Sequence, residues 1–94
     1  MKIKVQYISL VKSFTNKSQD EIEVSDDAVL SQVLDKVAAN YGKPFQEVYD
    51  ANQKEMKTTF VAMVNGVLMD QLKGMNTQLR NGDSIILMSL MTGG

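Results

Sequence analysis

Ser25–Gly42, with the sequence SDDAVLSQVLDKVAANYG, is the stretch that decides the fold. Apolar side chains recur in it every three or four residues and form one stripe, as in a helix that packs against a single neighbour. Segments on both sides of it alternate apolar and polar residues, which is the pattern of strands. One main helix covering a sheet built from both halves of the chain is therefore predicted. The stripe comprises Leu30, Val33, Leu34, Val37, Ala38 and Tyr41.

Residues typical of helix boundaries flank this helix on both sides. Ser25, Asp26 and Asp27 offer side-chain oxygens for an N-cap and place negative charge beside the positive end of the helix dipole. We therefore expect the helix to begin at Ala28, and capping leaves the two aspartates no evident role as metal ligands. Gly42 is the expected residue just after the helix, and proline two positions later prevents simple continuation.

The segment before the helix predicts a hairpin. Lys2–Tyr7 alternates polar and apolar residues, with the apolar ones on one face. Ser13–Asp20, SFTNKSQD, is rich in turn-forming residues, and Glu21–Val24 alternates again. Strand, polar turn and strand in this order indicate an N-terminal β-hairpin.

The segment after the helix predicts a short helix and three further strands. Pro44–Asn52 has apolar residues at helical spacing, although the polar residues that follow it fit a loop equally well. Phe60–Val64 and Val67–Met69 flank Asn65-Gly66, the dipeptide most typical of a two-residue hairpin turn. The last strand is expected over Ser84–Leu90.

The expected order is therefore β-β-α-(short α)-β-β-β. One apolar helix stripe can cover one face of a sheet, so the chain predicts a two-layer α+β fold. A mixed four- to five-stranded sheet packed on one main helix, with an additional short helix, is a β-grasp or ubiquitin-like fold. We expect this domain over residues 1–90, followed by a flexible diglycine tail over residues 91–94.

Composition weakens several classes of function. The 94 residues contain no cysteine and no histidine, which removes thiol chemistry, the usual general base near neutral pH and the commonest zinc ligand. Ten basic and eleven acidic residues nearly cancel, without the positive stripe typical of nucleic-acid binding. No apolar run approaches the length of a membrane span. A cytoplasmic protein that is not itself an enzyme, and that binds no metal, nucleic acid or membrane, is the expectation.

The last third of the chain resembles a known family. "VAMVNG" and then "LRNGDSIILMSLMTGG" follow the order of the small sulfur carriers related to ubiquitin, MoaD and ThiS, and resemble MoaD most. The N-terminal strands match more weakly. Two features differ: the stretch Met88–Thr92 lacks the proline that the family often has there, and the insertion at Pro44–Lys57 is longer than in ThiS. These differences leave the pathway open.

The resemblance implies a co-substrate without catalytic residues of its own. Gly94 would be adenylated and then thiocarboxylated by an E1-like enzyme of the MoeB or ThiF type, which consumes ATP; no bound cofactor is implied. Gly93 would supply clearance, since it lacks a Cβ. The implied receiver is a MoaE-like large subunit of molybdopterin synthase. Alternatives are a modifier joined through Gly94 to lysines of target proteins, or sulfur transfer for thiamine or tRNA thiolation. A third possibility is a plain interaction domain in which the two glycines have no function.

The last strand also predicts a docking surface. If Ile85 and Leu87 face the helix, the residues between them point outward on the open face of the sheet. An outward apolar row beside the reactive end suits adaptable contacts with a partner. The alternative is a strand buried on both faces. The predicted docking residues are Ile86, Met88, Leu90 and Met91.

Overall fold

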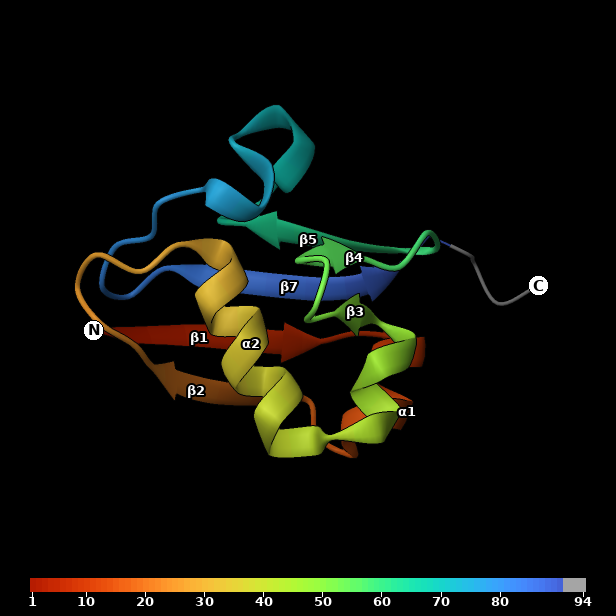
Figure 1. Cartoon of the computed structure of the whole chain (residues 1–94). Coiled ribbons are helices and arrows are strands. Elements are labelled where there is room, and N and C mark those ends of the chain that lie inside the picture. The colour runs from red at the N-terminus through yellow and green to blue at the C-terminus, as the bar shows by residue number, and fades with distance from the viewer. Residues whose placement is uncertain (91–94) are drawn as a thin grey trace.

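In the computed structural model, which describes residues 1–90, one helix crosses one face of a five-stranded sheet (Figure 1). The strand order in the sheet is β2-β1-β7-β5-β6. The helix is α2, Leu30–Tyr41. The strands are β1 (Lys2–Tyr7), β2 (Gln19–Glu23), β5 (Phe60–Val64), β6 (Val67–Leu68) and β7 (Ser84–Ser89).

The sheet is mixed, as predicted. β1 pairs antiparallel with β2 and parallel with β7, with Val5 beside Ile85. β7 also pairs antiparallel with β5, which turns through Asn65-Gly66 into β6. Both turn residues have positive φ, 50° and 83°, as a type I′ turn requires. First and last strands thus lie side by side, connected through α2, and the β-grasp prediction is confirmed.

The core forms between α2 and the inner face of the sheet. Ile3, Val5 and Tyr7 alternate with polar residues along β1, and all three are buried. Ile85 and Leu87 lie beside them on β7 and are also fully buried. From α2 the predicted stripe supplies the other side, with Ala38 and Tyr41 only partly buried at its end. The fully buried residues of the stripe are Leu30, Val33, Leu34 and Val37.

The start of α2 differs from the prediction. The helix begins at Leu30, and Val29 is the N-cap residue. Its backbone N–H donates to Oε1 of Gln32 at 2.8 Å. The backbone of this segment bonds across to the loop before β7, because Leu30 donates to the carbonyl of Thr77 at 2.9 Å. Val29 is extended and forms a β-bridge with Gln78 of the same loop, so α2 begins two residues later than predicted.

The predicted capping side chains bond elsewhere. Ser25 donates its hydroxyl to Asp27 at 2.9 Å, and Asp26 accepts from the ammonium group of Met1 at 3.2 Å. Neither aspartate caps α2. The other end follows the prediction: Gly42 has φ +69° and its N–H donates to the carbonyl of Ala38 at 2.8 Å.

The connection between β1 and β2 contains a helix that the sequence did not predict. This helix, α1, spans Leu10–Thr15 and ends at Asn16, which adopts the left-handed conformation. Val11 and Thr15 are buried, and Phe14 packs edge-on against Phe60. Packing against the rest of the molecule therefore stabilises a helix too short to form alone.

The predicted helix at Pro44–Asn52 is wrong beyond its first turn. A 3₁₀ helix, η1, covers Lys43–Glu47, and then β3 (Tyr49–Asp50) pairs with β4 (Glu55–Met56). Asp50 turns the chain by accepting the N–H groups of Asn52 and Gln53 at 2.9 and 3.1 Å.

Two single 3₁₀ turns, η2 (Met69–Gln71) and η3 (Gly74–Asn76), connect β6 to β7. In the part of the chain that the structure describes, no helix combines the length and the apolar character needed to span a membrane.

Candidate partner-binding face

β7 leads to the end of the described chain, so its position determines where residues 91–94 begin. It is the central strand of the sheet, between β1 and β5. Figure 1 shows β1 and β7 pointing to the same end of the molecule. Beyond the last residue of β7, Leu90 donates its backbone N–H to the carbonyl of Thr59 at 2.6 Å. The backbone of Leu90 is thus bonded to the residue that precedes β5. We call Leu90 the exit point.

The side chains of β7 alternate as predicted. Ile85, Leu87 and Ser89 are buried, whereas Ile86 and Met88 are partly exposed on the opposite face. Leu90 is exposed. The alternative of a strand buried on both faces is therefore wrong. The structure brings Ile86, Met88 and Leu90 to one face, while Met91, Gly93 and Gly94 lie outside the described residues.

This open face divides into two halves. On one half, Ile86 lies opposite Met63 of β5, which in turn lies opposite Leu68 of β6; Met88 lies opposite Val61. These five residues form what we call the apolar half-face. On the β1–β2 half, lysine and glutamate pair across the strands, with Lys2 opposite Glu23 and Lys4 opposite Glu21.

Three members of the apolar half-face, Val61, Met63 and Leu68, were missed by the sequence reasoning. The signal was present, because Phe60–Val64 alternates in the same way as β7 and its outward residues are apolar. The sequence alone does not indicate that β5 pairs with β7, and this pairing joins the two rows of apolar residues.

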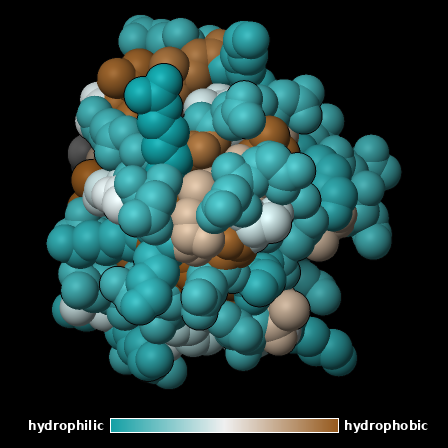
Figure 2. All heavy atoms as spheres, turned by 90° about the vertical axis from the view of Figure 1, so that its left-hand side faces the viewer, coloured by the Kyte–Doolittle hydropathy of each residue, from teal (hydrophilic) through white to brown (hydrophobic). Residues whose placement is uncertain are grey.

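The end of the molecule opposite the exit point, seen in Figure 2, is mostly hydrophilic.

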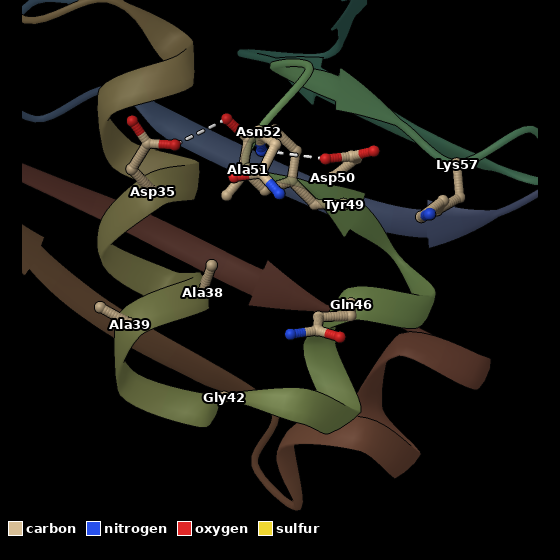
Figure 3. A pocket seen from close by; sticks show the side chains of 10 residues that line it. All are labelled: Asp35, Ala38, Ala39, Gly42, Gln46, Tyr49, Asp50, Ala51, Asn52 and Lys57. Carbon is tan, nitrogen blue, oxygen red and sulfur yellow. Dashed lines mark hydrogen bonds between the residues drawn. The ribbon is translucent and has the colours of Figure 1, made fainter.

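A cavity of about 500 Å³ lies between α2, η1 and the β3–β4 segment (Figure 3). Its lining includes Ala38 and Ala39 of α2 together with Asp35 and Tyr49. Asp35 accepts the Tyr49 hydroxyl at 2.8 Å and the Lys54 ammonium at 2.7 Å. Burial is the larger cause of a raised pKa of Tyr49, and the hydrogen bond to Asp35 raises it further. This phenol therefore stays protonated and neutral. This arrangement attaches the β3–β4 segment to α2 and offers no activated nucleophile or base.

A second polar cluster joins β1, β2 and the end of α2. Asp20 accepts hydrogen bonds from the hydroxyls of both Tyr7 and Tyr41, and Lys17 binds its other oxygen at 3.2 Å. Burial and the bond to Asp20 raise the pKa of Tyr41 to about 12. These groups connect the edge strand to the helix, and their role is structural.

A mixed sheet wrapped around one helix, with a central last strand that leads out beside an apolar half-face, defines a ubiquitin-like protein. The model of the ThiS family matches residues 5–94, and the chain belongs to that family. The family match and the β-grasp fold therefore agree.

Solved structures agree on the fold. The HVO 2177 protein of Haloferax volcanii is 23% identical, with a TM-score of 0.81, over 100% of this chain and 87% of that one. SAMP1 of Haloferax volcanii is 17% identical, with a TM-score of 0.80, over 100% of both chains. A putative molybdopterin converting factor, subunit 1, from Pyrococcus furiosus is 20% identical, with a TM-score of 0.76, over 96% and 98%. No curated protein matches the chain in sequence.

Proposed function

We propose that this chain carries sulfur as a thiocarboxylate on Gly94 and donates it in the synthesis of molybdopterin. The observation that carries the proposal is the extent of the family match, which continues past the last strand through Gly93 and Gly94. The similarity in fold to the Pyrococcus furiosus protein, whose description names a molybdopterin converting factor, supports the choice of pathway.

The chemistry has two steps, because a carboxylate is a poor electrophile. An oxygen of the Gly94 carboxylate attacks the α-phosphorus of ATP, and pyrophosphate leaves. Hydrosulfide then attacks the carbonyl carbon of the acyl-adenylate, AMP leaves with one carboxylate oxygen, and loss of the proton on sulfur gives the thiocarboxylate. Gly93 and Gly94 have no Cβ and can pass through a narrow channel to both reactions. Both steps belong to an E1-like partner of the MoeB or ThiF type, and this chain is its co-substrate.

The apolar half-face supplies the docking surface in this scheme. Ile86 and Met88 are partly exposed on the open face of the sheet, and Leu90 is exposed at the exit point. Met91 follows in sequence. Methionine adapts its shape to different partners, which suits a carrier that binds first the activating enzyme and then a MoaE-like large subunit. Contact with these residues would orient the four residues that follow Leu90.

A second candidate function is protein modification, in which a lysine of a target attacks the activated Gly94. The observation that favours it is the similarity in fold to the small archaeal modifier proteins from Haloferax volcanii and Methanosarcina acetivorans. Both functions use the same acyl-adenylate and differ in the nucleophile that receives it.

The test separates the two by following the fate of the activated chain. Thiocarboxylated protein is mixed with the large subunit of the same organism's molybdopterin synthase and with the sulfur-free pterin precursor. We expect sulfur to appear in the pterin and the chain to return to its carboxylate mass. Formation of amide-linked lysine adducts in a lysate, without sulfur transfer to the pterin, would show the modifier function instead.

A further inference from the structure

Large apolar side chains are exposed at the end of the molecule where the chain leaves the sheet. Ile8, Leu10 and Leu90 are 39%, 49% and 60% exposed. Ile8 donates its N–H to the carbonyl of Leu87 at 3.0 Å, which places Ile8 beside the last residues of β7. Leu10 begins α1, which Figure 1 shows at this end of the sheet.

A cavity of about 570 Å³ opens beside the exit point. Its apolar lining residues are Leu10 and Phe14 of α1 and Phe60 of β5, and its polar lining residues are Gln46, Glu47, Lys57, Thr58 and Thr59. The rings of Phe14 and Phe60 meet edge-on with their centres 6.3 Å apart. Thr59 is also the residue whose carbonyl holds Leu90, so cavity and exit point share a wall.

A strained turn presents Leu10 to solvent. Val11 donates its N–H to the carbonyl of Ile8 at 3.2 Å, and Ser9 between them has φ 56° and ψ −127°. These angles are those of the first central residue of a type II′ turn, a position that favours glycine. A serine there costs conformational energy, and such strain is concentrated at functional sites.

The length of the chain beyond Leu90 limits what can approach Gly94. Four extended residues span at most about 14 Å, so an active site that accepts Gly94 must come within that distance of the exit point. Its rim must then cover the surface around Leu90.

Resting on the proposed function, we infer that the activating enzyme covers an exit collar made of Ile8, Leu10, Phe14, Phe60 and Leu90. An apolar side chain of the enzyme occupies the cavity between Leu10 and Phe60. The collar lies on the α1 side of the exit point, beyond the apolar half-face.

The test compares Leu10→Ala with Leu72→Ala as a matched control, since Leu72 is 40% exposed and lies outside the collar. The activation rate is followed by ATP–pyrophosphate exchange with the activating enzyme while the carrier concentration is varied. We expect Leu10→Ala to raise the KM for the carrier about tenfold at unchanged kcat, and Leu72→Ala to change it less than about twofold. Thr58→Phe, which places a ring at the cavity, should match Leu10→Ala and retain the wild-type Tm.

Unchanged KM in both Leu10→Ala and Thr58→Phe would overturn the collar while leaving the proposed function intact. An equal rise in Leu72→Ala would also overturn it, because the effect would then not be local. Failure of the wild-type chain to be activated would instead overturn the proposed function, and the collar with it.

Discussion

Ser9 shows how a single residue can oppose stability. Its φ of 56° with ψ −127° lies where a Cβ is unfavourable, and its neighbours fix the turn through the bond between Val11 and Ile8. Glycine adopts these angles without strain but loses more backbone entropy on folding. We expect the relief of strain to exceed the entropic loss.

Ser9→Gly is therefore predicted to raise the free energy of unfolding by about 1 kcal/mol, measured by urea denaturation. Ser13→Gly is the matched control, because Ser13 lies inside α1 and donates to the carbonyl of Leu10 at 2.6 Å. That change should lower the free energy by about 0.5 kcal/mol. A loss of stability in Ser9→Gly would show that the turn is not strained.

Asp20 gives the stability a dependence on pH. Burial alone would raise its pKa, but hydrogen bonds from Tyr41, Tyr7 and Lys17 outweigh burial and lower the pKa below its usual value of 3.8. A carboxyl group with a lowered pKa stabilises the fold fully above its unfolded pKa. This stabilisation disappears as the pH falls through the lower, folded pKa.

Asp20→Asn should consequently flatten the acid limb of the stability curve below about pH 4. Urea midpoints measured between neutral pH and the acid limb test this, with exposed Asp70→Asn as the control. The wild type and the control should lose stability in parallel as the pH falls. An acid limb in Asp20→Asn as steep as in the wild type would contradict the role assigned to this cluster.

Among the elements, those with strong local patterns were predicted and those fixed by distant contacts were not. The stripe of α2, the alternation of β1 and β7 and the Asn65-Gly66 turn are all encoded by neighbouring residues, and each is observed. The short strand β3 pairs with β4, and its Tyr49 donates to Asp35 on α2, a contact between residues that are distant in sequence. The same holds for α1, whose second half lies in the stretch Ser13–Asp20 that the sequence predicts as a turn and whose Phe14 packs against the distant Phe60.

The candidate site likewise contains residues that local sequence predicts and residues that only strand pairing brings together. The outward orientation of Ile86, Met88 and Leu90 follows from alternation and is confirmed. Val61, Met63 and Leu68 join them only because β5 pairs with β7 and β6 with β5. The cavity beside Leu10 depends on the position of α1, which local sequence did not indicate.

The substitution Met63→Glu tests whether the apolar half-face of the sheet is the docking surface. A charge in the middle of an apolar contact should weaken the complex with the large synthase subunit at least about tenfold in Kd, measured by calorimetry. Gln6→Glu is the matched control, because Gln6 lies in the same row, directly beside Ile86, on the charged half of the face. Equal affinities for both variants would place the docking surface elsewhere.

At the scale of the whole molecule, stability and reactivity are assigned to different parts of the chain. Within the described residues 1–90, buried side chains of α2 and of the sheet form a core. The group proposed to react belongs to Gly94, four positions past Leu90. Deleting Gly93 and Gly94 should therefore abolish activation and leave the Tm unchanged, as followed by thermal denaturation. A lower Tm would mean that the two glycines contribute to the fold.

The central claim is that Gly94 accepts sulfur, and the intact mass of the chain tests it most directly. The protein is incubated with ATP, a sulfur source and the activating enzyme of its own organism, and the variant lacking Gly93 and Gly94 serves as the control. We predict that the wild type gains the mass of one sulfur minus one oxygen, located by fragmentation at Gly94, while the control is unchanged. An unaltered wild-type mass with an enzyme that activates a known carrier would contradict the account.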